Sequence, residues 1–518
     1  MLPLVFYNLG YEAYWQDELI SYYVAKFIIL TNLPFLPSGF VYPKAELYSY
    51  ILAFFIKVFG ADNGAPRAIS GVEYLLTLAL LYRVGCSFFD RRIALLACIM
   101  LGLSPHALIW ARQMRMYQQA QLLTLLSVYL FYRAAQQRQR VYLVYLAVAS
   151  LLVTYLSHEE TFIILPALLL CIFLAGYVMR DKQHRLPSFL YSKHWWIAAA
   201  IAVGLISFQL FIVQATHPPV LGTDNTSRPQ VQFNTDNIPY YFNLLFMPTA
   251  NDPSNSTLVS NIPTSILWSS ILAVCGCFWA RKEECLSVKY TALFFVVGFL
   301  TLVFLFTMQA DRYFYPLATF YYLLAAYAFM KIVRGIVRFA QTRASANQQE
   351  KASLPLSVLV SLSAALVFLS VVITPMLPLS NYNLFVSRAL GLSYYQHFGD
   401  YQEAGQYVRE HMRQGDIVIS IIPDSIVLYY VGQSDYFFSI NHALFLFEQD
   451  GHIVDTYTGQ IALLRQSDFD TVLAQHARIW LISADNHYQR NALKHFVIPL
   501  DFHIVYAGTN SIVYLRGT

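Results

Sequence analysis

Charged residues are scarce in this chain. Of its 518 residues, 12% are Asp, Glu, Lys or Arg and 57% are hydrophobic, whereas soluble domains carry roughly 25% charged residues. The sequence also lacks the short alternating segments of a transmembrane β-barrel. It instead repeats apolar stretches of about 20 residues, a length that crosses the hydrocarbon core as a helix. These features exclude a soluble fold and predict a polytopic α-helical membrane protein.

Cysteine and nucleotide-binding motifs are also rare or missing. The chain has 6 cysteines, none of them within residues 215–261 or after residue 378. This usage indicates neither a disulfide framework nor a zinc motif. We interpret the close pair Cys275 and Cys277 as small apolar residues of a helix. The sequence contains no G-x-G-x-x-G and no P-loop, which excludes the nucleotide sites that these motifs build.

The apolar segments and the charges between them predict a topology. The candidate spans are 67–83, 93–110, 117–134, 141–157, 160–179, 195–214, 262–280, 289–308, 315–333 and 355–377. Lys and Arg concentrate in every second connection, and the positive-inside rule assigns those connections to the cytoplasm. The opposite face then carries 17–18, 112–115, 158–160, the 215–261 loop, 311–312 and everything after about 378. Residues 45–60 are too short for a span, and we expect an amphipathic helix at the outer surface there.

The composition changes after residue 378. Residues 400–415 have the pattern of an amphipathic helix ended by glycine. Short β-branched runs predict strands at 416–422, 478–483, 502–506 and 511–514. We therefore expect a transmembrane domain over 1–378, with a first outer loop at 11–66, and an extracytoplasmic α/β domain over 379–518.

The adjacent carboxylates Asp17 and Glu18 precede the first span. Carboxylates beside a membrane are costly unless they pair or perform chemistry, and a carboxylate can take a proton from an attacking hydroxyl. The alternative for both is a helix cap or a surface ion pair. Glu159 is a further candidate base. The segment His158-Glu159-Glu160 could also contribute to a metal site, but no third ligand follows at a fixed spacing, so a structural cluster or a contact to sugar hydroxyls is favoured.

Several cations share the predicted outer face. Arg312 lies where a span meets the headgroup layer, and its guanidinium suits a phosphate oxygen. Arg112 and Arg115 are three residues apart on one helical face, and two positive charges on the outside run against the inside bias. Ordinary snorkelling of interfacial arginines is the alternative. The 38 Tyr and 38 Phe residues are suited to an interfacial belt and to sugar stacking.

The order of these features resembles bacterial GT-C glycosyltransferases that use polyprenyl-phosphate sugars, related to protein O-mannosyltransferases and lipid A aminoarabinose transferases. The segments that carry the resemblance are 7–10, 15–18, 42–48, 59–60, 67–70, 104–105, 115–117, 312–313, 401–410 and 415–416. Ala45 and Glu46 stand where the family usually has two prolines. The family's first transmembrane helix should precede the first outer loop, so we expect an apolar segment upstream of residue 1.

The resemblance implies an inverting glycosyltransferase that moves a sugar from a polyprenyl-phosphate donor to a glycan, lipid or protein acceptor outside the cytoplasmic membrane. It makes Asp17 the catalytic base, with Glu18 beside it. The implied substrate-binding residues are Lys44, Glu46, Arg67, Arg112, Arg115, Tyr117, His158, Glu159, Arg312 and Tyr313. A metal is compatible with this chemistry but not required, and no nucleic acid is involved. The competing functions are a transporter or flippase for a lipid-linked or anionic solute and a non-catalytic envelope assembly protein.

Overall fold

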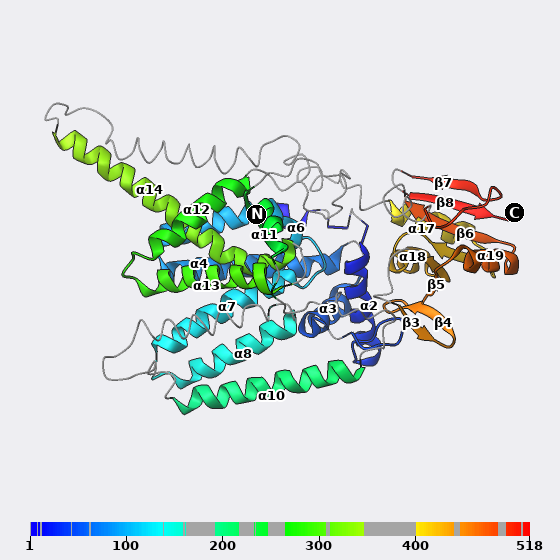
Figure 1. The fold of residues 1–518 in the computed structure, drawn as a ribbon, viewed down its shortest axis with the longest axis horizontal. Coiled ribbons are helices and arrows are strands. Elements are labelled where there is room, and N and C mark those ends of the chain that lie inside the picture. The colour runs from blue at the N-terminus through cyan, green and yellow to red at the C-terminus, as the bar shows by residue number, and fades with distance from the viewer. Residues whose placement is uncertain are drawn as a thin grey trace.

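The computed structural model describes residues 2–7, 9–10, 13–42, 44–61, 64–137, 139–158, 161, 192–216, 233, 235–246, 265–306, 311–346, 400–439, 446–484, 494–508 and 511–517. The first part of the chain is helical, and the last part forms a sheet with helices (Figure 1). The helices α2 and α3 lie between these two parts. The far end of α14 points away from the sheet.

The helical part contains the membrane-spanning elements. Its helices are α1 (Leu2–Phe6), α2 (Gln16–Thr31), α3 (Glu46–Phe59), α4 (Ala68–Phe88), α5 (Arg91–Gly102), α6 (Pro105–Ala111), α7 (Tyr117–Gln136), α8 (Val141–Ser157), α10 (Lys193–Thr216), α11 (Asn237–Phe246), α12 (Ser265–Ala280), α13 (Leu286–Leu305) and α14 (Ala318–Ala346). Among the described residues, four segments have the length and apolarity of a span, namely Ala65–Phe88, Lys193–Ile212, Leu286–Leu305 and Tyr315–Phe339. The prediction of a multi-pass helical membrane protein is confirmed.

Most of the predicted spans coincide with helices, with one clear exception. The span expected over 93–110 is interrupted, because α5 ends at Gly102 and α6 starts at Pro105. Proline lacks an N–H and clashes with the preceding turn, so it starts a helix rather than continuing one. Ser104 caps the new helix through its side chain. The spans expected at 160–179 and 355–377 lie outside the described residues.

The positively charged connections gather at one end of the helical part. Arg334 pairs with Asp90, and Lys331 pairs with Glu283. Asp90 follows α4 and Glu283 follows α12, whereas Lys331 and Arg334 lie in α14. Their meeting agrees with the predicted charge alternation, which assigned all of these connections to one side.

The helix α2 was absent from the predicted spans. It carries acidic residues in its first turn, where they interact favourably with the helix dipole. The predicted helix at 45–60 is present as α3. The side chains of Tyr48, Leu52 and Ile56 are buried, whereas those of Phe54 and Phe59 are exposed.

The α/β part contains α17 (Tyr401–His411), β1 (Ile417–Ser420), α18 (Asp424–Val431), β2 (Tyr436–Phe438), β3 (Leu446–Gln449), β4 (His452–Asp455), β5 (Ile461–Leu463), α19 (Gln466–Gln475), β6 (Ile479–Ala484), β7 (His503–Ala507) and β8 (Ser511–Arg516). Its strands form one sheet of order β3-β4-β5-β2-β1-β6-β8-β7. The central strands β5, β2, β1 and β6 are parallel, and the outer ones are antiparallel. The predicted α/β fold of the C-terminal part is therefore confirmed. The predicted boundary at 378/379 falls outside the described residues.

The expected helix over 400–415 is shorter than predicted. It ends at His411, and Gly415 lies in the following turn with φ +92°. Asp416 closes this turn by accepting a hydrogen bond from the Arg413 amide at 2.8 Å. The glycine therefore belongs to the turn before β1 rather than to the helix end.

The sheet domain packs onto the start of the helical part through α18. The amide of Tyr14 donates to the hydroxyl of Tyr430 at 2.6 Å, and the hydroxyl of Tyr23 donates to the carbonyl of Ser425 at 3.2 Å. Tyr429 makes edge-to-face contact with Tyr14 at a centroid distance of 5.6 Å. The helix α2 and the residue Tyr14 before it are thus in contact with α18.

Candidate active site

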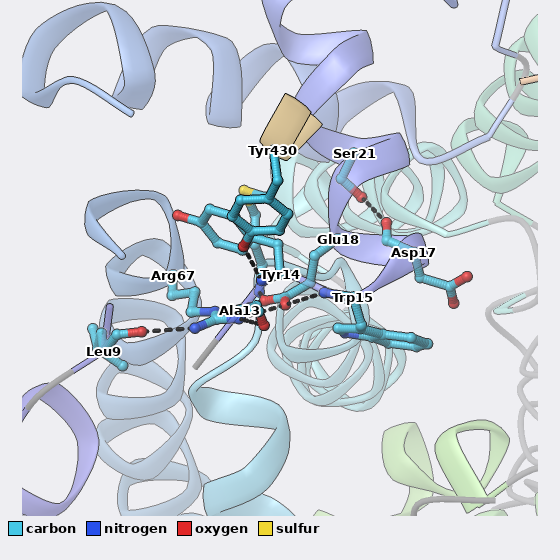
Figure 2. A network of polar contacts seen from close by, with 10 residues as sticks. Leu9, Ala13, Tyr14, Trp15, Asp17, Glu18, Ser21, Arg67 and Tyr430 are labelled. Carbon is cyan, nitrogen blue, oxygen red and sulfur yellow. Dashed lines mark hydrogen bonds and ion pairs between the residues drawn. The ribbon is translucent and has the colours of Figure 1, made fainter. Parts of the chain in front are cut away.

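The first turn of α2 places Asp17 and Glu18 in different environments. Glu18 accepts a hydrogen bond from the amide of Trp15 at 3.4 Å, which closes the start of the helix. Figure 2 shows the Glu18 side chain directed toward Arg67, while the carboxylate of Asp17 points away from that pair. The two carboxylates therefore have different surroundings.

Glu18 is fully buried and has both oxygens occupied. Arg67 donates to Oε1 at 2.8 Å and to Oε2 at 2.7 Å, and the amide of Met114 donates to Oε1 at 2.8 Å. Arg67 also donates to the carbonyls of Leu9 and Ala13 at 2.7 and 3.1 Å. A two-point pair of this kind is strong and directional. It ties the N-terminal segment, α2, the start of α4 and the turn before α7 together.

Asp17 is partly accessible and lies between two arginines. Its side chain is 26% exposed, and its Oδ2 is 3.4 Å from Nη2 of Arg115 and 3.8 Å from Nη1 of Arg312. Arg115 is buried and is fixed by donating to the Asp17 carbonyl at 2.7 Å and to the hydroxyl of Ser21 at 2.9 Å. Arg312 is 27% exposed. Asp17 and Arg312 are both partly exposed, so a ligand can contact a carboxylate and a guanidinium at the same place.

Aromatic rings lie close to the guanidinium groups of Arg115 and Arg312. Arg115 and Arg312 lie 5.6 and 5.8 Å from the ring centroid of Tyr117, and Arg312 is 5.4 Å from that of Tyr313. Cation–π contacts hold a guanidinium in place without neutralising its charge. The ring of His158 lies 5.2 Å from that of Tyr117.

The side chain of His158 is under the electrostatic influence of three cations. Burial lowers the pKa of His158 well below its usual range, and the positive charges of Lys44, Arg115 and Arg312 lower it further. The imidazole is therefore neutral at physiological pH. Lys44 precedes α3, so a third cation from a distant part of the chain lies in the same neighbourhood.

The remaining predicted residues are placed elsewhere or have structural contacts. Arg112 donates to the carbonyls of Leu4, Val5 and Tyr7 at 3.1, 3.2 and 2.9 Å, so it satisfies the free carbonyls at the end of α1. Glu46 accepts from Gln209 of α10 at 2.9 Å. Tyr313 is buried against Phe306 at a centroid distance of 4.8 Å. Glu159 lies outside the described residues.

The sequence reasoning missed Ser21 and the tyrosines of α18. Ser21 is one turn after Asp17, but this relationship becomes visible only once α2 is known to be a helix. Tyr430 reaches the site region from the end of the chain, and no local pattern predicts that approach. Among the described residues, no group of three or more His, Cys, Asp or Glu side chains converges in the manner of a metal site.

The chain is similar to known proteins in part of its sequence and in its fold. Residues 44–212 match the family described as Dolichyl-phosphate-mannose-protein mannosyltransferase. No curated protein sequence matches the chain significantly. Among solved structures, the chain is similar to ArnT from Cupriavidus metallidurans in the apo state, with a TM-score of 0.62 and 12% identity over 99% of this chain and 96% of that one.

Two further structures extend the comparison. The same ArnT bound to undecaprenyl phosphate matches with a TM-score of 0.61 and 11% identity over 99% of this chain and 96% of that one. The archaeal oligosaccharyltransferase AglB from Archaeoglobus fulgidus, in complex with an inhibitory peptide and a dolichol-phosphate, matches with a TM-score of 0.52 and 13% identity over 91% and 66% of the two chains. The chain therefore has the GT-C fold, as its sequence motifs predicted.

Proposed function

We propose that the protein is an inverting membrane glycosyltransferase that transfers a sugar from a polyprenyl-phosphate donor. The fold and the match to the mannosyltransferase family over residues 44–212 support this class. The undecaprenyl phosphate and dolichol-phosphate named with the similar structures support the donor type. The acceptor is a glycan, a lipid or a protein.

The observation that carries this proposal is the position of the Asp17 carboxylate. It is partly exposed and lies within 4 Å of two guanidinium groups, at 3.4 and 3.8 Å. The glycosyl transfer needs a base for the acceptor hydroxyl and a positive site for the phosphate. The group around Asp17 supplies both from residues far apart in the chain.

The reaction follows from these roles. Asp17 takes the proton of the acceptor hydroxyl while its oxygen forms a bond to the anomeric carbon. The bond from that carbon to the phosphate oxygen breaks, and the lipid phosphate leaves with the electron pair. Arg312, with Lys44 and Arg115, stabilises the charge that develops on the phosphate. Attack opposite to the leaving group inverts the anomeric configuration.

Glu18 has a different role in this proposal. Both of its oxygens already accept hydrogen bonds from Arg67 and Met114, so it is not available to an acceptor. We assign it to positioning the first turn of α2, on which Asp17 stands. Asp17 and Glu18 are adjacent in the sequence, but their proposed roles differ.

A divalent metal is not required by this chemistry. Such a cation prefers several oxygen ligands, whereas the side chains paired with Asp17 here are guanidinium groups. An oligosaccharyltransferase from Archaeoglobus fulgidus with a similar fold has been crystallised in complex with Zn and sulfate. The proposed reaction uses no metal.

The proposal places the site and the α/β domain outside the cytoplasmic (inner) membrane. The cationic connections that pair at Asp90 and Glu283 would face the cytoplasm under the positive-inside rule. Labelling of single cysteines introduced near residue 450 and near residue 283 in intact cells would test this orientation.

Transport of a lipid-linked solute is the second candidate. One observation favours it: Glu73 of the span-forming helix α4 is buried and accepts from Gln119 at 2.9 Å, and buried carboxylates within spans often mark transport pathways. Purified protein in nanodiscs with an undecaprenyl-phosphate sugar separates the candidates. An enzyme cleaves the sugar from the lipid and loses this activity with Asp17→Asn, whereas a transporter leaves the donor intact.

A further inference from the structure

The first turn of α2 takes part in two arginine–carboxylate pairs of different geometry. Arg67 donates to both oxygens of Glu18, at 2.8 and 2.7 Å, so this pair is closed. The pair of Asp17 and Arg115 is more open, because Nη2 of Arg115 is 3.4 Å from Oδ2 of Asp17. The same kind of side chain therefore binds one carboxylate tightly and stays at a longer distance from its neighbour.

The shorter contacts of Arg115 are to the backbone of α2 and to Ser21. Its Nη1 donates to the Asp17 carbonyl at 2.7 Å and to the Ser21 hydroxyl at 2.9 Å. Ser21 follows Asp17 by one helical turn, and its hydroxyl donates to the same carbonyl at 3.2 Å (Figure 2). Ser21 and Arg115 are both buried. The N–H groups of Nη1 are thus directed at the helix rather than at the carboxylate.

The direction of these N–H groups matters for the proposed base. A guanidinium that is closed on a carboxylate occupies its lone pairs and stabilises its ionised form. A carboxylate in that state is a poor proton acceptor, and Glu18 is bound in this way. Asp17 has positive charge beside it, but its arginine is held by the backbone and by Ser21, so an acceptor hydroxyl can still reach the carboxylate.

We propose that Ser21 is a positioning residue, which holds Arg115 in the open geometry and so keeps Asp17 able to accept a proton. This inference rests on the proposed function. Without the Ser21 hydroxyl, one N–H of Nη1 would be a buried donor that has lost its partner, which is costly. The Asp17 carboxylate is an acceptor within reach, so the guanidinium should close on it as Arg67 does on Glu18.

The test compares four proteins in nanodiscs: the parent, Ser21→Ala, Ser21→Thr and the control Ser49→Ala. Ser49 is a buried serine of the neighbouring helix α3, and its hydroxyl donates to the Ala45 carbonyl at 3.0 Å. Three quantities are measured for each protein. They are the affinity for undecaprenyl phosphate, the single-turnover release of sugar from undecaprenyl phosphate mannose, glucose and aminoarabinose, and the melting temperature.

The proposal expects a loss of rate without a loss of affinity. Ser21→Ala should release the sugar about tenfold more slowly than the parent, the size of one hydrogen bond to a charged group. Its affinity for undecaprenyl phosphate should be unchanged, because Arg312 and Lys44 remain. Ser21→Thr keeps a hydroxyl and should restore the rate, and Ser49→Ala should behave as the parent.

A second-site variant separates positioning from a general effect on the fold. Ser21 acts only through Arg115 in this proposal, so Ser21→Ala should cause no further loss of rate in an Arg115→Met background. A serine that merely stabilises α2 would lower the rate or the melting temperature by a similar amount in both backgrounds.

Chemical labelling gives a readout that does not depend on turnover. A water-soluble carbodiimide and an amine should modify Asp17 more slowly in Ser21→Ala than in the parent, because the closed pair shields the carboxylate. The buried Glu18 should stay unmodified in both proteins. Mass spectrometry of the peptides identifies the modified residue.

Other results overturn the proposal. A parental rate or parental labelling of Asp17 in Ser21→Ala would do so, as would an equal loss of rate in Ser49→Ala. Lower affinity of Ser21→Ala for undecaprenyl phosphate would place its effect at the phosphate and contradict the proposal. A parent that neither binds this lipid nor releases any of the sugars would contradict the proposed function, while the labelling still decides the role of Ser21. If Ser21→Ala does not fold, Ser21→Cys provides the same comparison.

Discussion

Asp17 and Glu18 are neighbours in the chain, but they face opposite sides of the first turn of α2 (Figure 2). Glu18 is 0% exposed and paired with Arg67 through two hydrogen bonds, whereas Asp17 is 26% exposed between Arg115 and Arg312. Substituting each carboxylate should therefore produce a different kind of defect.

Asp17→Asn should abolish transfer while preserving the fold. The amide keeps the size of the side chain but cannot accept a proton, so the single-turnover rate should fall by at least about a hundredfold. Binding of undecaprenyl phosphate should persist, since the cations remain. The measurement is single-turnover transfer at matched protein amounts, and near-normal turnover would move the base to another residue, with Glu159 the next candidate.

Glu18→Gln should weaken the fold more than the chemistry. The amide leaves the buried Arg67 without a counter-charge, and breaking a buried pair costs about 3–5 kcal/mol. We expect a clearly lower melting temperature in detergent. The double variant Glu18→Gln/Arg67→Met should recover part of this loss, because it removes the unpaired charge. A Glu18→Gln protein with parental stability but no turnover would contradict the positioning role.

Arg312→Ala should lose both donor affinity and rate. The phosphate is negative in the ground state and more so as it leaves, so the cation acts at both stages. Arg312→Lys keeps the charge without the paired hydrogen bonds and should be partly impaired. Arg112→Ala is the matched control, because Arg112 donates to the backbone carbonyls of residues 4, 5 and 7 at the end of α1. Parental affinity for undecaprenyl phosphate in Arg312→Ala would exclude Arg312 from the phosphate site.

The α/β domain should be more stable in mild acid than in base. Burial raises the pKa of Asp424 well above its usual range, with a further increase from Asp455, and burial raises the pKa of Asp455 to about 6. Both residues titrate near pH 4 when unfolded. The folded form therefore binds more protons, so this contribution to stability is full below about pH 4 and is lost as the pH rises through about 6.

Asp455→Asn tests this dependence. The amide oxygen can still accept from Tyr457 and Thr458, but the side chain no longer ionises. The variant should melt higher than the parent at about pH 8, and the gain should shrink toward about pH 5. A difference that is equal at both pH values would show that the carboxylate does not ionise in the folded domain.

Removal of metals should leave transfer intact. The charge on the leaving phosphate is assigned to Arg312, Lys44 and Arg115, so dialysis against a chelator should not change the single-turnover rate. Loss of activity that Mg²⁺, Mn²⁺ or Zn²⁺ restores would require a metal in the mechanism.

Much of the fold followed from the sequence, because long apolar runs and charge alternation report directly on membrane helices. The strands at 478–483 and 511–514 were predicted from their β-branched residues, of which Ile479, Ile482 and Val513 are buried in β6 and β8. The interruption at Pro105 was missed, although proline was a local signal for it.

The site was less predictable than the fold. The sequence placed Asp17, Arg115 and Arg312 on one face, but it could not separate Asp17 from Glu18. That difference depends on Arg67 and Met114, which are brought to Glu18 by packing. The approach of Tyr430 to Tyr14 depends on how the α/β part packs against the helical part, and no periodicity or motif in the sequence predicts that packing.

The hydrogen bond between the Tyr14 amide and the Tyr430 hydroxyl joins residues 416 positions apart. A contact of such long sequence separation forms late, because a large loop must close first. During synthesis, the helix with the proposed base emerges long before α18, which completes its surroundings. The protein should consequently acquire activity only after the last part of the chain has been made and has folded. A chain stalled before residue 430 would be inserted in the membrane but would be inactive.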